Sequence, residues 1–116
     1  ARYLVNVVDM PHEGNFIVPS VVNRGPLTIA ISTGGASPAL SKAIRKEIEK
    51  HYSNEFSLYL RFVETIRKRA MNKIPYARER EKFLRSLASD DMMQLLRKGG
   101  FRKARNRILT HLKSFK

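Results

Sequence analysis

Short hydrophobic runs dominate the first third of the chain. Residues 3–8 are rich in β-branched and apolar types and end at Asp9. Two further runs, 16–22 and 27–32, are separated by the turn residues 23–26, and the second of them alternates large apolar with smaller or polar side chains. Such runs are typical of β-strands. The pattern predicts one buried strand followed by a β-hairpin.

The first strand lacks an obvious partner in this pattern. The chain also begins at Ala1, without an initiator methionine. We therefore expect the strands that pair with residues 3–8 to lie upstream of the chain.

Apolar residues at helical spacing dominate the remainder of the chain. A loop of small residues, 32–38, ends in Ser37-Pro38, a pair that favours a helix start. Residues of the following segment recur every four positions and predict a helix that buries one stripe: Leu40, Ile44, Ile48 and Tyr52. Similar stripes, bounded by Pro75 and by Gly99-Gly100, predict helices over about 53–72, 77–88, 89–98 and 102–114.

The composition is that of a globular protein and excludes several other classes. With 116 residues, 42% of them hydrophobic and 28% charged, the chain has the size and make-up of one globular core. No apolar run approaches the ~20 residues that cross a bilayer, and no signal peptide is evident, so we expect a cytoplasmic protein that does not bind membranes. The absence of cysteine excludes disulfides, thiol catalysis and cysteine-ligated metals.

The formal net charge of +13 is concentrated after residue 39, because residues 1–39 hold two basic and two acidic side chains. Such a field attracts polyanions, and a basic nucleic-acid-binding module is the alternative hypothesis for function. Runs of basic residues on helices are more often a solvated face. Since no nucleic-acid recognition motif accompanies them, we expect no specific nucleic-acid partner.

Three features are candidates for chemistry. Asp9 ends an apolar strand, where ligands bind in open α/β sheets, although an Asp before Met10-Pro11 also suits a simple turn. Backbone N–H groups of the Thr33-Gly34-Gly35 loop could face an anion at a helix start, or the loop could be only a strand-to-helix turn. The histidines do not have the spacing of a metal site, and only His12 lies near Asp9 in the sequence. We expect no bound metal.

The order of these segments resembles the siroheme synthase family. The resemblance covers about residues 3–50, and it is carried by four motifs: Val5-Asn6-Val7-Val8-Asp9-x-Pro11, Phe16-Ile17-x-Pro19-Ser20, Arg24-x-Pro26-Leu27 and Ile31-Ser32-Thr33-Gly34-Gly35-x-Ser37-Pro38. The helical remainder fits the family only in type and length.

This resemblance implies an α+β fragment. Residues 1–12 would be the last strand of a truncated NAD-binding Rossmann domain, residues 13–41 a central β-hairpin with the Thr-Gly-Gly loop, and residues 42–116 an all-helical dimerisation domain. The chain would then be a homodimer. Because the glycine-rich NAD-binding turn of the family lies upstream, this chain alone is expected to be inactive.

The resemblance also implies a reaction and its residues. The full enzyme would oxidise precorrin-2 to sirohydrochlorin with NAD, and some relatives then insert ferrous iron as a ferrochelatase. Asp9 matches the family's aspartate that handles a proton or a metal. The remaining candidates would contact the tetrapyrrole, whose eight carboxylates suit a basic protein: Asn6, His12, Ser32, Thr33 and Gly34. Thr33 stands where some bacterial members have a phosphorylatable serine.

Overall fold

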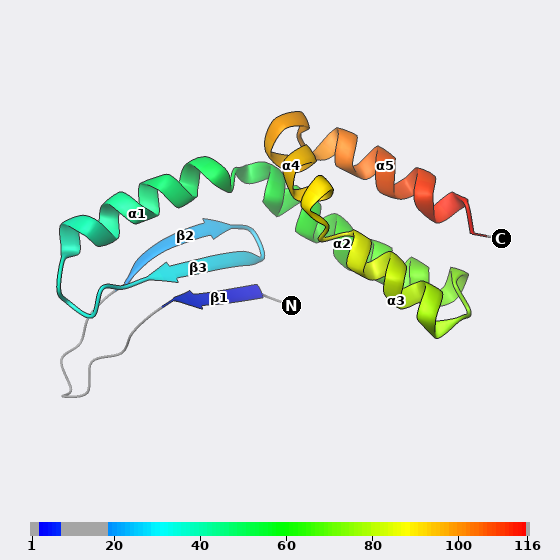
Figure 1. The fold of residues 1–116 in the computed structure, drawn as a ribbon, viewed down its shortest axis with the longest axis horizontal. Helices are drawn as coiled ribbons and strands as arrows, with labels where there is room; N and C mark the ends of the chain where they lie inside the picture. Colours follow the sequence, from blue (N-terminus) through cyan, green and yellow to red (C-terminus); the bar gives the residue numbers. More distant parts are fainter. Residues whose placement is uncertain (1–2, 8–18, 116) are drawn as a thin grey trace. The chain divides into compact units, whose positions relative to one another are not determined.

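The computed structural model describes residues 3–7 and 19–115. It divides into two compact units, Ala1–Asn54 and Glu55–Lys116. The first unit contains a small sheet with one helix, and the second unit is helical (Figure 1). The α+β class predicted from the sequence is confirmed.

The sheet has three strands, β1 (Tyr3–Val7), β2 (Ser20–Arg24) and β3 (Leu27–Ile31), in the order β1-β3-β2. β2 and β3 are antiparallel, which confirms the predicted hairpin. The hairpin turns at Gly25, whose φ of 62° is a conformation that glycine adopts without strain.

β1 pairs with β3 in parallel, with Tyr3 opposite Leu27 and Val7 opposite Ile31. The expectation that all partners of this strand lie upstream was therefore wrong. The reason is topological: parallel strands are not joined by a tight turn, so their pairing is not visible in neighbouring residues. β3 is consequently the central strand of the sheet.

Helix α1 (Pro38–His51) lies along one face of the hairpin (Figure 1). Its start was correctly predicted, since the Ser37 hydroxyl accepts a hydrogen bond from the Leu40 N–H at 3.1 Å. At its other end, Arg24 Nε donates to the carbonyl oxygen of Tyr52 at 2.6 Å. The end of β2 is thereby fastened to the end of the helix.

The predicted buried stripe of α1 was wrong at its first position. Leu40 is 53% exposed, whereas the neighbouring Ser41 is buried, and Ile44 and Ile48 are half-buried. A serine can replace an apolar residue against the sheet here because its hydroxyl finds hydrogen-bond partners there.

The second unit consists of α2 (Asn54–Lys73), α3 (Ala77–Ser86), α4 (Asp90–Gly99) and α5 (Phe101–Lys113). These bounds agree with the predicted helices to within about two residues at most ends. The core of the unit is formed by apolar side chains from all four helices and their connections: Phe56, Tyr59, Ile66, Ala70, Ile74, Phe83, Leu87, Met92, Leu96, Ala104, Ile108 and Leu112. None of the described helices is both long and apolar enough to span a membrane.

Candidate functional site

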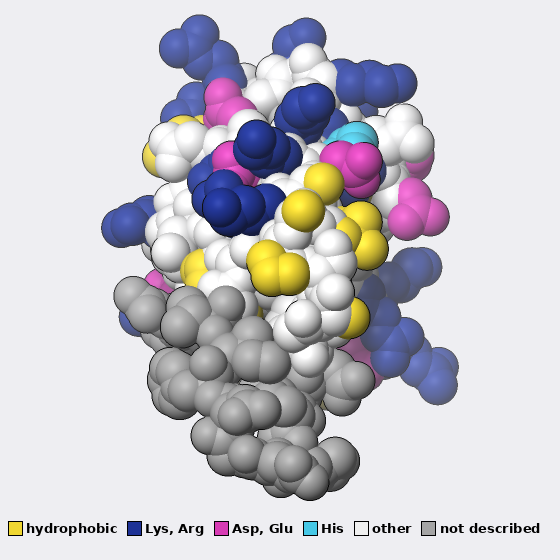
Figure 2. Space-filling model, turned by 90° about the vertical axis from the view of Figure 1, so that its left-hand side faces the viewer, with side chains coloured by type: hydrophobic (Ala, Val, Ile, Leu, Met, Phe, Trp, Pro, Cys, Tyr) yellow, Lys and Arg dark blue, Asp and Glu magenta, His cyan; other side chains and the backbone are white. Residues whose placement is uncertain are grey.

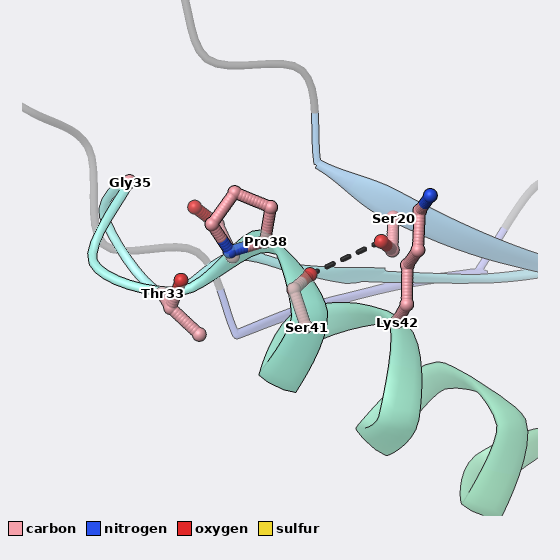
Figure 3. A pocket seen from close by; sticks show the side chains of 7 residues that line it. Ser20, Thr33, Gly35, Pro38, Ser41 and Lys42 are labelled. Atoms are coloured by element: carbon pink, nitrogen blue, oxygen red, sulfur yellow. Dashed lines mark hydrogen bonds between the residues drawn. The ribbon is translucent and has the colours of Figure 1, made fainter.

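A small pocket lies where β3 leads into α1. Its volume is about 150 Å³, and residues from β2, from the loop after β3 and from the first turns of α1 line it: Ser20, Ser32, Thr33, Gly35, Pro38, Ser41 and Lys42 (Figure 3). The pocket therefore contains the loop that the sequence singled out, together with side chains from two other elements.

The loop is held in shape by its own hydrogen bonds. Thr33 Oγ1 donates to the Ser37 carbonyl oxygen at 3.1 Å and accepts from the Ser37 N–H at 3.0 Å. The Gly34 N–H donates to Ser32 Oγ at 3.1 Å. Gly34 and Gly35 have φ values of 65° and 83°, which explains why glycines occupy both positions. Thr33 thus has a structural role as well as a place in the pocket wall.

Ser41 joins the helix to both strands of the hairpin. Its hydroxyl donates to Ser20 Oγ at 3.0 Å and lies 3.2 Å from the Ile31 carbonyl oxygen, a second acceptor for the same proton (Figure 3). Because a hydroxyl has one proton and two lone pairs, Ser20 can accept from Ser41 and still donate elsewhere. The Ser20 hydroxyl is therefore a donor available to a ligand in the pocket.

Lys42 is the charged residue among those described in this pocket wall. It follows Pro38 by four positions, so helical periodicity places the two residues on the same face of α1. Figure 3 shows its side chain extending alongside Ser20. The face drawn in Figure 2 carries Lys and Arg side chains beside hydrophobic ones. The described residues thus offer the pocket hydroxyl groups and one positive charge.

The structure brings some of the predicted site residues to the pocket and not others. Ser32 and Thr33 line the pocket, Gly34 lies in the same loop, and Asn6 is on β1 opposite Ala30. Asp9 and His12 lie outside the described residues. The assignment of these residues to catalysis and substrate binding stays a prediction.

Sequence inspection missed Ser20, Ser41 and Lys42. Ser20 belongs to one of the family motifs, but nothing in that motif connects it to a residue 21 positions later. The spacing of Pro38 and Lys42 was the available signal for the lysine, since it places both on one helix face.

Among the described residues, no group of three His, Cys, Asp or Glu side chains could hold a metal ion.

Comparison with known proteins connects this geometry to a family. Residues 24–51, which include the loop and the whole of α1, match the family model described as "Sirohaem biosynthesis protein central". Siroheme synthase 3 of Aeromonas hydrophila is 35% identical over 100 residues, which is 85% of this chain and 21% of that protein. The siroheme synthase of Salmonella schwarzengrund is 31% identical over 111 residues, which is 96% of this chain and 24% of that protein.

The fold has a solved counterpart in SirC, a precorrin-2 dehydrogenase. The TM-score is 0.65 at 24% sequence identity, over 90% of this chain and 49% of that one. The chain spans under a quarter of the length of the two siroheme synthases. Residues 24–51 therefore match the central region of the sirohaem biosynthesis family, and the chain is similar to the siroheme synthases over most of its length.

Proposed function

We propose that the protein containing this chain acts in siroheme biosynthesis, by oxidising precorrin-2 to sirohydrochlorin with NAD as hydride acceptor. The observation that carries the proposal is that residues 24–51, which match the family, contain every described residue of the pocket wall except Ser20. The similarity to siroheme synthases also extends beyond this segment, over most of the chain.

In this proposal the residues have separate tasks. Asp9 accepts a proton from the macrocycle or handles a metal, and Asn6, His12, Ser32, Thr33 and Gly34 contact the tetrapyrrole. Ser32 Oγ accepts from the Gly34 N–H and keeps its own proton, which suits a ligand with many carboxylates, because hydrogen bonds to a charged acceptor are stronger than neutral ones. The internal bonds of Thr33 support its loop in the shape that meets the ligand.

The Thr33-Gly34-Gly35 loop does not fit NAD itself. A dinucleotide site presents backbone N–H groups of a glycine-rich turn to the pyrophosphate. Here the Gly34 N–H is bonded to Ser32, and the Thr33 hydroxyl is bonded to Ser37. We therefore assign NAD to no described residue and derive no step through it.

The test of the reaction uses the full-length protein with precorrin-2 and NAD. Replacing Asp9→Ala should lower kcat by about 10²–10⁴-fold, the usual contribution of a general acid or base. Formation of sirohydrochlorin, followed by its absorbance, is the measurement. Glu47→Ala, which removes an exposed carboxylate from α1, is the matched control and should keep full turnover. Unchanged turnover in the Asp9 variant would exclude the role given to this residue.

We further propose that ferrous iron is a substrate of the same protein, inserted into sirohydrochlorin to give siroheme. The macrocycle itself supplies the metal's ligands, so the reaction does not require a cluster of histidines. Insertion of iron or cobalt into sirohydrochlorin should be faster with the full-length protein than without it. Equal rates would rule out the chelatase activity and leave the dehydrogenase proposal intact.

A further inference from the structure

The volume of the pocket restricts what it can hold. Sites for drug-sized ligands occupy roughly 300–1,000 Å³, and the pocket at the start of α1 has about 150 Å³. It is therefore too small for a tetrapyrrole ring, but it has room for one short side arm of such a ring. The arms of the proposed substrate end in carboxylates.

The charge of the pocket matches such an arm. Among the described residues of its lining none is acidic, and Lys42 is the one that carries a formal charge. Within the part of the chain that the structure describes, Lys42 makes no ion pair, whereas Arg45 on the same helix is paired with Glu49 at 3.5 Å. The lysine charge is thus available to an anionic ligand.

The hydroxyl groups of the pocket supply a second contact. Ser41 is buried, and its donation to Ser20 Oγ at 3.0 Å fixes the position of the Ser20 oxygen. The Ser20 proton is left to donate into the pocket, beside the side chain of Lys42 (Figure 3). A carboxylate accepts from both a hydroxyl and an ammonium group.

We propose that Ser20 and Lys42 form a subsite that binds one carboxylate arm of the tetrapyrrole and so orients the ring. This inference rests on the proposed function and adds two residues to it. Ser41 is a positioning residue, because it holds Ser20 and does not itself reach the ligand. Neither Ser20 nor Lys42 takes part in proton or hydride transfer.

The experiment measures binding of sirohydrochlorin to the full-length protein, by quenching of the tetrapyrrole's fluorescence. Lys42→Ala should raise the dissociation constant about tenfold, the size of one charge-assisted hydrogen bond. Lys42→Arg keeps the charge and should retain most of the affinity. Ser20→Ala should weaken binding in the same direction.

Lys50→Ala is the matched control for lost charge. Lys50 is also exposed, on the same helix, eight positions and about 12 Å further along, which exceeds the Debye length in physiological salt. Its removal should leave the affinity nearly unchanged. A sirohydrochlorin octamethyl ester, which has no free carboxylate, should bind to wild type and Lys42→Ala equally.

The outcomes separate the two proposals. Wild-type binding together with equal affinity of Lys42→Ala, or equal weakening by Lys42→Ala and Lys50→Ala, would overturn the subsite and leave the proposed function standing. A persistent difference between wild type and Lys42→Ala with the ester would also overturn it, because the contact would then not involve a carboxylate. A wild-type protein that binds no sirohydrochlorin would overturn the proposed function and the subsite together.

Discussion

At the scale of single residues, Tyr59 shows how the helical unit uses a polar group in its core. Its side chain is 5% exposed, and its hydroxyl donates to the Leu87 carbonyl oxygen at 2.6 Å. Burial raises the pKa of Tyr59 well above its ordinary value, because the phenolate would lose its hydration. The hydroxyl therefore ties α2 to the connection after α3 only in its protonated form.

Replacing Tyr59→Phe should lower the free energy of unfolding by about 1–2 kcal/mol near neutral pH, since the Leu87 carbonyl oxygen loses its buried donor. In the wild type, Tyr59 contributes fully to the free energy of unfolding below about pH 10, because tyrosine is neutral there in both the folded and the unfolded state. At higher pH the unfolded tyrosine ionises first, since the folded pKa is raised, and this contribution is lost. The difference between the two proteins should therefore shrink above pH 10 in urea unfolding.

Tyr76→Phe provides the comparison, because Tyr76 is 70% exposed. This variant should unfold like the wild type at every pH. A difference between wild type and Tyr59→Phe that stays constant up to pH 11 would show that ionisation of the buried hydroxyl is not linked to folding.

The candidate site also shows what single residues reveal before a structure is known. Ser32 and Thr33 were found because they adjoin a Gly-Gly pair, which marks a special backbone conformation in the sequence itself. Ser20 and Lys42 become neighbours of this loop only when β2 and α1 pack on each other. Contacts of that kind leave no periodic signal along the chain.

At the scale of elements, the start of α5 depends on a residue from another helix. Its N-cap, Gly100, has no side chain to bond the first N–H groups, and Glu55 of α2 accepts the Phe101 N–H at 2.9 Å instead. Gly100 has φ 82° and ψ 176°, a conformation almost restricted to glycine. The junction of α4 and α5 therefore requires both the glycine and the carboxylate.

Gly100→Ala should destabilise the protein by about 1–3 kcal/mol, from backbone strain and from a Cβ that would lie 3.3 Å from Glu55 Oε1. Gly99→Ala is the adjacent comparison. It requires Lys103 Cδ, 2.9 Å from the added Cβ, to move, but this atom belongs to a flexible side chain, and alanine is favoured over glycine within a helix. Thermal unfolding of both variants tests the difference, and equal midpoints would contradict the role of the Gly100 backbone.

Helix boundaries were well predicted because they depend on local chemistry, whereas β2 continues to Arg24, two residues into the predicted turn. Ser37-Pro38 and Ser89 mark helix starts, and both serine hydroxyls accept from the N–H three residues later. The pairing of β1 with β3 and the side of α1 that packs on the sheet depend on tertiary contacts. The partners of β1 were expected upstream, and Leu40, which was expected to be buried, is exposed. Helix caps and apolar stripes can therefore be recognised in this sequence, whereas the partners of a strand cannot.

At the scale of the whole molecule, the positive charge belongs mainly to the helical unit. Residues 55–116 hold 17 of the 23 Lys and Arg residues but only six of the ten Asp and Glu residues. The same unit exposes large hydrophobic side chains: Leu58, Met71 and Tyr76. We propose that this unit forms a homodimer, in which apolar contact is opposed by repulsion between like charges.

Light scattering of the full-length protein should give twice the monomer mass at physiological salt. Because added salt screens the repulsion, the dimer should become tighter as the salt concentration rises. Binding to DNA, the rival use of the charge, should weaken over the same range, since salt competes for the phosphates. A monomer mass at every salt concentration would exclude the dimer.

The strand order β1-β3-β2 has a consequence for how the protein reaches its native state. Leu27 pairs with Arg24 across a turn of two residues, and it pairs with Tyr3 only after the long intervening segment has closed. Loop closure costs more entropy as the loop lengthens, and hairpins form within about 1–10 μs. We therefore expect the hairpin to form early and β1 to add afterwards along an edge that β3 already offers. β1 then pairs with a strand that has already formed, although β3 is synthesised after β1.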